Sequence, residues 1–272
     1  MKPTCLLLIG SFICAGALYS TASAQALRNG VHPYGARPNG TVTRTGSYDS
    51  SRYGNGTFTQ SVTRSPGSAQ RSLSWTNANG GTGSHTATNT WNSAAGTGTH
   101  QSSTTYANGK TSSSQGDWTK TGAGDYSYSG THTGVNGQVT DVSRTVTNSD
   151  GTKTVDSTYT NAATGKSSTV DKSITDANGS KQVDTTATGP NGKSVTSDQT
   201  YTKADNGWTK TGTITGPNGG VSTDNQTVSY THNSNGTITR TSNGSVTGPN
   251  GNTHQFGNTE TYTKTYTSNT TD

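Results

Sequence analysis

Along most of the chain, threonine or serine alternates with other residue types at a period of two. Residues 237–241 carry threonine at every second place, and so do residues 259–267, where Tyr262 and Tyr266 fall on the opposite face. Side chains two residues apart share one face of a β-strand. Threonine, valine, tyrosine and tryptophan also favour strands. Because no window shows an apolar stripe of period 3.6, the pattern predicts strands and essentially no helix after residue 24.

Short turn sequences rich in asparagine, aspartate and glycine separate these runs. Three of them read Thr-Gly-Pro-Asn-Gly, at residues 188–192, 215–219 and 247–251. Asn-Gly and Asp-Gly adopt positive φ at low cost, as type I′ hairpin turns require. The turn glycines recur about every fourteen residues, which marks the chain as a repeat protein. We place the turns at Gly40, Gly56, Gly67, Gly80, Gly96, Gly109, Gly124, Gly137, Gly151, Gly165, Gly179, Gly192, Gly207, Gly219, Gly236 and Gly251.

These features predict an all-β fold, a repetitive antiparallel meander of strand-plus-turn units with about sixteen strands. A β-solenoid would also fit the repeat length, although hairpins need Asn-Gly turns and solenoid corners do not. A largely disordered chain is the third alternative, because only 24% of the residues are hydrophobic. An open meander would expose strand edges, so we expect possible partners to include other copies of the chain, joined through sheet edges.

The first 24 residues have the pattern of a secretory signal peptide. Lys2 precedes an apolar run over residues 5–18, and Ala22-Ser23-Ala24 forms a small-x-small cleavage site. We therefore expect cleavage after Ala24, a secreted, extracellular or periplasmic location, and no transmembrane segment in the mature chain. Both cysteines lie within the leader, so the mature chain has no thiol for disulfides or metal ligation.

Positive charge is concentrated early in the mature sequence. We divide the mature chain into a basic segment with weak repeats, residues 25–68, and a Thr/Gly/Asn-rich β-repeat region, residues 69–272. The segment from Gln25 to Trp75 contains six arginines and a single carboxylate, Asp49. Such a segment can bind an anionic partner such as a polysaccharide, or can serve only as a solvated basic stretch.

Tryptophans and arginines are the best candidates for ligand contacts. An exposed aromatic ring on a sheet can stack on a sugar or a base. Alternatively, the rings pack pairwise across strands and give the sheet its hydrophobic cohesion. The candidate polyanion or carbohydrate contacts are Arg44, Arg52, Arg64, Arg71, Trp75, Trp91, Trp118 and Trp208.

The sequence contains no recognisable catalytic set. Glu260 is the only glutamate, the six histidines are scattered singly, and nucleophile-elbow, phosphate-loop and zinc-protease motifs are absent. We therefore expect no enzymatic activity, no cofactor and no metal site.

The Thr-Gly-Pro-Asn-Gly units resemble those of exported bacterial repeat proteins. The matching residues are turn residues, so the resemblance implies a repeat architecture and export but no site residues. Taken together, the sequence predicts an exported structural or interaction protein of the cell envelope or extracellular matrix, with a role at the cell surface in adhesion or biofilm formation. The alternatives are a carbohydrate- or polyanion-binding module and a disordered polar spacer.

Overall fold

The computed structural model describes residues 39–51, 54–177 and 179–267. The chain divides into two compact units, and the unit Pro38–Asp272 contains every described strand. The predicted signal peptide and its cleavage site lie outside the described residues, as does Arg52.

The described chain is built from strands and turns, as predicted. Within these residues there is no helix that is long and apolar enough to cross a membrane. The sixteen strands are β1 (Gly40–Ser50), β2 (Gly54–Ser65), β3 (Ser68–Asn77), β4 (Thr82–Asn92), β5 (Thr97–Thr105), β6 (Thr111–Lys120), β7 (Tyr126–Thr133), β8 (Val139–Ser149), β9 (Thr152–Asn161), β10 (Ser167–Ala177), β11 (Ser180–Thr188), β12 (Ser194–Ala204), β13 (Gly207–Thr215), β14 (Val221–His232), β15 (Ile238–Thr247) and β16 (Thr253–Thr267).

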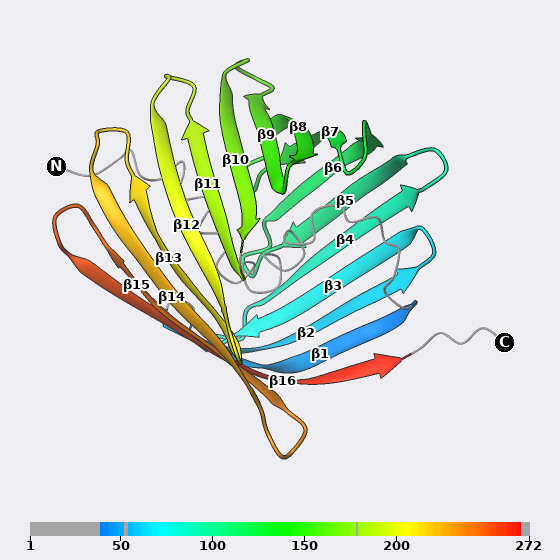
Figure 1. Ribbon diagram of the computed structural model, residues 1–272. Helices are drawn as coiled ribbons and strands as arrows, with labels where there is room; N and C mark the ends of the chain where they lie inside the picture. Colours follow the sequence, from blue (N-terminus) through cyan, green and yellow to red (C-terminus); the bar gives the residue numbers. More distant parts are fainter. Residues whose placement is uncertain (1–38, 52–53, 178, 268–272) are drawn as a thin grey trace. The chain divides into compact units, whose positions relative to one another are not determined.

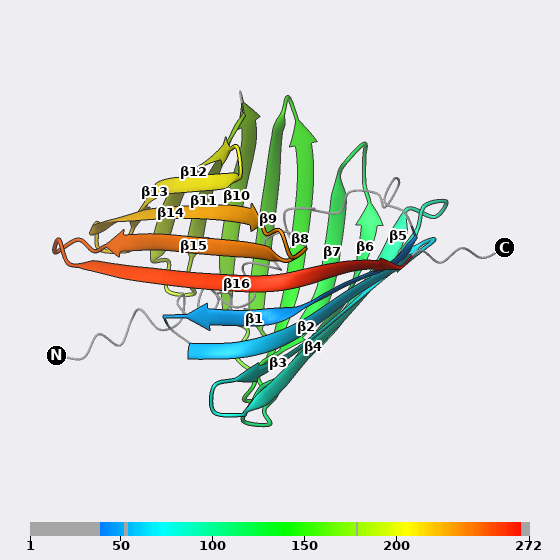
Figure 2. The ribbon, with the colours of Figure 1, turned by 90° about the horizontal axis from the view of Figure 1, so that it is seen from below.

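Each strand pairs antiparallel with its neighbours in sequence, and β1 then pairs with β16 to close the sheet into a barrel (Figure 1). At this seam Thr43 lies opposite Thr265, and Figure 2 shows β16 between β15 and β1. The meander prediction is confirmed, and the solenoid and disordered alternatives are wrong. Closure also corrects the expectation of pairing between copies through sheet edges, because none of the sixteen described strands has an open edge.

The expected boundary between residues 68 and 69 has no counterpart in the sheet. Strands β1 and β2 come from the basic segment, yet β2 pairs with β3 over most of its length, from Gly56 opposite Asn77 to Ser65 opposite Ser68. Both segments therefore contribute to one barrel.

The recurring turn is a type I turn followed by a glycine bulge, not the expected type I′ turn. In the unit 188–192, the amide of Gly192 donates to the carbonyl of Gly189 at 3.0 Å, and Gly189 donates to the carbonyl of Lys193 at 2.9 Å. Proline and asparagine occupy the two central positions, where negative φ is required, and Gly192 adopts a φ of +74°. Asp150-Gly151, with φ of +50° and +77°, has two consecutive positive φ values, as a type I′ turn requires.

Three of the predicted turn glycines lie in strands instead. Gly40 begins β1, Gly207 begins β13, and Gly56 is inside β2, where the nearby positive φ belongs to Gly54. Tyr48 explains the position of Gly56, because a Cβ there would lie 2.3 Å from the tyrosine hydroxyl. A glycine thus marks either a turn or a close approach of a ring, and sequence spacing alone did not separate the two.

Alternation of side chains gives the barrel an inner and an outer wall. All fourteen buried non-glycine residues of the described strands fall on the same face of the sheet, which we assign as the inner wall: Tyr48, Ser50, Gln60, Ala69, Thr104, Tyr126, Val146, Ser157, Gln199, Asp224, Val228, Arg240, Ser242 and Tyr262.

The outer wall is formed mainly by threonine and serine hydroxyls. Many of them hydrogen-bond across neighbouring strands, as in Thr41 with Thr63 at 2.9 Å and Thr247 with Thr253 at 2.8 Å. Cross-strand pairs of this kind each stabilise a sheet by about 0.2–1 kcal/mol. The repeated threonines of the sequence therefore mark the outside of the barrel.

Glycines on the inner wall make room for aromatic rings of adjacent strands. Trp75 lies over Gly83, its directly opposite partner on β4, where a Cβ would come within 2.2 Å of the indole. Phe256 lies over Gly244 in the same manner. These contacts bury the apolar surface of the rings. The protein has few aliphatic side chains, so the rings supply apolar area that those side chains cannot.

Candidate functional site

Charge is separated between the two walls of the barrel. Every lysine and arginine in a described strand falls on the inward-facing register: Arg44, Arg64, Arg71, Lys120, Arg144, Lys153, Lys172, Lys181, Lys203, Lys210, Arg240 and Lys264. The inward carboxylates are only Asp176, Asp224 and Glu260. The outer wall carries no lysine or arginine within a described strand and seven carboxylates: Asp49, Asp117, Asp141, Asp156, Asp171, Asp184 and Asp198. The inner wall is therefore strongly cationic and the outer wall acidic.

The seven described candidate contacts all lie on this inner wall, distributed over β1, β2, β3, β4, β6 and β13. Arg44 stacks over the ring of Tyr262, with its guanidinium carbon 5.4 Å from the ring centroid. With the side-chain amide of Gln60 oriented so that its oxygen faces Arg71, this oxygen accepts a hydrogen bond from Nε of Arg71 at 2.9 Å. The arginines thus lie on an inner wall with aromatic and amide partners, which differs from the solvated basic tail that composition alone permits.

Trp91, Trp118 and Trp208 each pack against a tyrosine of another strand, which is the neighbouring strand for Trp118 and Trp208 but β7 for Trp91 on β4. The ring centroids are 5.7 Å apart for Trp91 and Tyr126, and 4.6 Å apart for Trp118 and Tyr128. Such pairs contribute about 0.5–1.5 kcal/mol beyond their buried area. Between β12 and β13, the ring centroids of Tyr201 and Trp208 are 5.7 Å apart. Cross-strand packing of the aromatic residues is therefore their first role.

Trp91 and Trp118 are also brought to one cavity. The cavity has a volume of about 420 Å³ and is lined by Gly98 on β5, which lies directly opposite Trp91 on β4 and Trp118 on β6. Asp117 and several threonines complete its lining. Asp117 and the lining threonines belong to the outer wall, whereas the two tryptophans belong to the inner wall, so the lining includes residues of both faces of the sheet. Trp75 and Trp208 do not contribute to this cavity.

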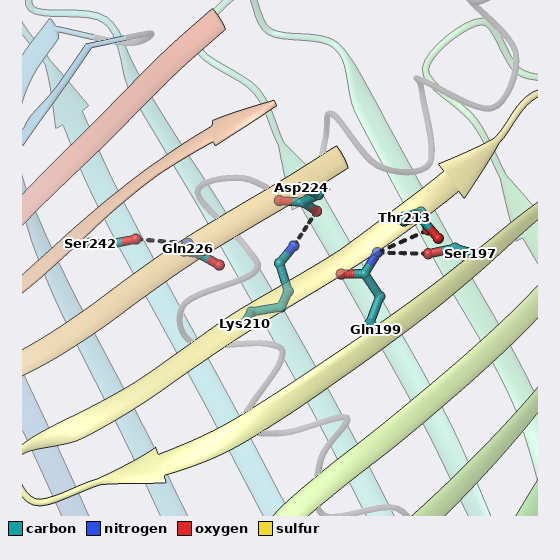
Figure 3. Close-up of polar contacts among 7 residues, drawn as sticks. All are labelled: Ser197, Gln199, Lys210, Thr213, Asp224, Gln226 and Ser242. Atoms are coloured by element: carbon teal, nitrogen blue, oxygen red, sulfur yellow. Dashed lines mark hydrogen bonds and ion pairs between the residues drawn. The ribbon is translucent and has the colours of Figure 1, made fainter. Parts of the chain in front are cut away.

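Inward carboxylates are engaged in ion pairs. Nζ of Lys181 lies 2.8 Å from Asp176, and Nη1 of Arg240 lies 3.6 Å from Glu260. Lys210 forms a short ion pair with Asp224 between β13 and β14 (Figure 3). Since the described strands carry twelve inward cations and only three inward carboxylates, the inner wall has an excess of positive charge.

A buried polar network surrounds the Lys210–Asp224 pair. Figure 3 shows Gln199 on one side, donating from its amide to Ser197 at 2.9 Å, and Gln226 on the other side, donating to Ser242 at 2.7 Å. Gly212 stands between Gln199 and Asp224 in the register, so their long side chains meet no Cβ there. The network holds four adjacent strands together.

No family model, no curated protein and no solved structure matches the chain. The resemblance to exported repeat proteins therefore stays a prediction. Among the described residues, no group of three or more histidine, cysteine, aspartate or glutamate side chains is placed to hold a metal ion.

His85 makes the inner wall sensitive to acid. Burial, then the positive charge of Arg71, lower its pKa from 6.5 to about 4, and Nδ1 lies 3.0 Å from the hydroxyl of Thr104. The unfolded state binds the proton first, so stability should fall as pH drops from 6.5 to 4 and then level off. After discounting for solvent, we expect a loss of about 1–2 kcal/mol. Urea unfolding at several pH values should show this loss, and His85→Gln should reduce the dependence, the remainder coming from groups such as His100 and His132, whose pKa values burial also lowers; a slope equal to wild type would contradict it.

Aspartates face each other directly on the outer wall. Asp156 lies opposite Asp171, and Asp184 lies opposite Asp198. Like charges directly opposite are destabilising by about 0.2–1 kcal/mol. We expect Asp171→Asn to raise the free energy of unfolding by about that amount at low salt, with the gain disappearing at high salt. Asp49→Asn, which lies opposite Thr259 and Asn55, is the matched control and should change little.

The sequence analysis did not detect that positive and negative charges lie on different faces of the sheet, because it compared only the charges of successive segments of the chain. The signal is present in the alternation: each strand cation is in phase with aromatic or aliphatic residues of its strand and out of phase with most of the threonines. Arg144, Lys153 and Lys172 were missed for this reason, because they lie in the nearly neutral part of the sequence.

Proposed function

We propose that this chain is an exported binding protein whose cationic inner wall takes a polyanionic ligand, such as an acidic polysaccharide of the cell envelope or extracellular matrix. The observation that carries the proposal is the separation of charge in the described strands, with all twelve strand cations inside and seven of the ten strand carboxylates outside. An excess of positive charge on a barrel interior costs stability, which an anionic ligand would recover. Neighbouring tryptophans supply surfaces on which sugar rings stack.

Binding of defined oligosaccharides tests the proposal. The chain from Gln25 should bind sulfated and carboxylated oligosaccharides and not the neutral backbone of the same length, measured by calorimetry. Affinity should fall steeply with salt, because each neutralised charge releases counterions. Equal binding of the neutral oligosaccharide, or salt-independent affinity, would overturn it.

The predicted cleavage is tested separately. Mass spectrometry of the exported protein should give a chain that begins at Gln25. Retention of residues 1–24 in the exported product would contradict the assignment of a cleaved leader.

A second candidate role, as a structural or adhesive component of the cell surface, is supported by the outer wall. Its hydroxyls form regular cross-strand pairs, and a groove of about 360 Å³ on β4–β7 is lined by serine, threonine and glutamine. Such a surface can hydrogen-bond to hydrated polymers. Adhesion of cells lacking this chain should fall in that case, and variants of the outer groove residues Gln101 and Gln115 should reproduce the defect.

A further inference from the structure

Three cations lie around one valine on the inner wall. Val155 on β9 is directly opposite Val146 on β8 and Lys172 on β10. Lys153 precedes Val155 by two residues on the same face. Arg144 lies opposite Ser157, which follows Val155 by two residues. Directly opposite residues of neighbouring strands are about 5 Å apart and diagonal ones about 7–8 Å apart, so three long side chains can reach a common point.

The guanidinium of Arg144 is held in position by neutral groups. Its Nε donates to Oγ of Ser157 at 2.9 Å, and its Nη2 donates to the hydroxyl of Tyr159 at 3.2 Å. Ser157 is buried, with 4% of its surface exposed, so this anchor is rigid. Neither partner neutralises the positive charge, and Nη1 is not used in these two bonds.

Electrostatic strain accompanies this arrangement. Burial, and then the charge of Arg144, lower the pKa of Lys172. Burial, followed by Lys181 and Arg144, lowers the pKa of Lys153. The closest inward carboxylate in the register, Asp176, is paired with Lys181 at 2.8 Å. The charge of Arg144 therefore opposes that of each lysine in a half-buried place, where a bound anion would stabilise all three cations.

We propose that Arg144, Lys153 and Lys172 form an oxyanion site that takes a sulfate or phosphate ester group. This proposal rests on the proposed polyanion-binding function and names the chemical class of the ligand. A tetrahedral ester has three terminal oxygens, which match one guanidinium and two ammonium groups from three adjacent strands. A carboxylate has two oxygens and so offers fewer acceptors than the three cationic groups can use.

Calorimetry with matched oligosaccharides separates the ester chemistries. The probes are a sulfated, a phosphorylated and a carboxylated oligosaccharide of equal length and charge. Lys153→Gln/Lys172→Gln should weaken binding of the sulfated or phosphorylated probe, or both, by tenfold or more, and the carboxylated probe by less than threefold. This double variant leaves the bonds of Arg144 intact. Circular dichroism should show an unchanged fold.

A charge-matched control distinguishes this site from general electrostatics. Lys110→Gln/Lys166→Gln removes two positive charges from turns outside the strands. It should change affinity less than twofold. Equal losses in the two double variants, or an equal loss for the carboxylated probe, would overturn the site while leaving the polyanion-binding function standing.

Inorganic pyrophosphate tests the site without an oligosaccharide. It should raise the melting temperature of the wild-type chain in a concentration-dependent way, and the double variant should show less than a fifth of that rise. If no oligosaccharide binds but pyrophosphate stabilises only the wild type, the proposed function fails and the oxyanion site stands. Equal or absent stabilisation of both proteins by pyrophosphate overturns the site.

Discussion

Asp224→Ala should lower the free energy of unfolding by about 3–5 kcal/mol, because it leaves the ammonium of Lys210 without its counter-charge on the inner wall. The side chains of Lys210 and Asp224 are only 17% and 11% exposed, so water cannot replace the lost carboxylate efficiently. The same change also removes a neighbour of the buried network around Gln199 and Gln226. Urea denaturation monitored by tryptophan fluorescence would measure the loss.

Two control variants define the cause of this effect. Asp176→Ala breaks the pair with Lys181, whose side chains are 67% and 36% exposed, and should cost about 0.2–1 kcal/mol. Lys210→Met/Asp224→Leu replaces the buried pair by apolar groups of similar size and should recover most of the stability. If the double variant were as unstable as Asp224→Ala, an unpaired buried charge would not be the reason.

Gly46→Val should be at least as damaging, because it places a branched side chain in the seam that closes the barrel. Gly46 on β1 lies opposite Tyr262 on β16 and Phe58 on β2, two rings whose centroids are 6.5 Å apart. A Cβ at this position would lie 2.0 Å from the carbonyl oxygen of Thr261 and 2.8 Å from Cα of Tyr262. These are backbone atoms, so relief requires separating β1 from β16. We expect a loss of about 3 kcal/mol or more, at the upper end of what overpacking costs.

Ser47→Val is the matched control, since Ser47 is the next residue of β1 and is exposed on the outer wall. It should alter the free energy of unfolding by about 0.5 kcal/mol or less. Hydrogen exchange should show that Gly46→Val exposes the amides of β1 and β16 first, while β8 to β12 stay protected. Uniform loss of protection would contradict a local opening of the seam.

Most of the local structure could be predicted from the sequence. Threonine alternation identified strands, and fourteen of the sixteen predicted turn glycines have positive φ. The exceptions, Gly56 and Gly207, lie in strands, and Gly56 faces a tyrosine ring that only the folded sheet brings there. The turn type was also missed, because Pro190 and Asn191 fit the centre of a type I turn as well as the flank of a type I′ turn.

The candidate site could be predicted only in part. The tryptophans and arginines were chosen by residue type, and the described ones share a wall, yet only Trp91 and Trp118 meet at one cavity. The cluster of Arg144, Lys153 and Lys172 required knowledge of register, since its members are separated by 9 and 19 residues along the chain. Sequence distance does not show that Lys172 lies opposite Val155 on the neighbouring strand.

By itself the sequence determined the strands, their turns and the alternation of two chemically different faces, because these depend on interactions among residues close along the chain. Only the tertiary structure decided that the sheet closes, with Thr43 on the first strand opposite Thr265 on the last. Pairing of the two ends depends on the twist and stagger accumulated over all sixteen strands, which no local pattern records. Closure is also what turned one face into an inner wall, and so brought the positive charges of distant strands together.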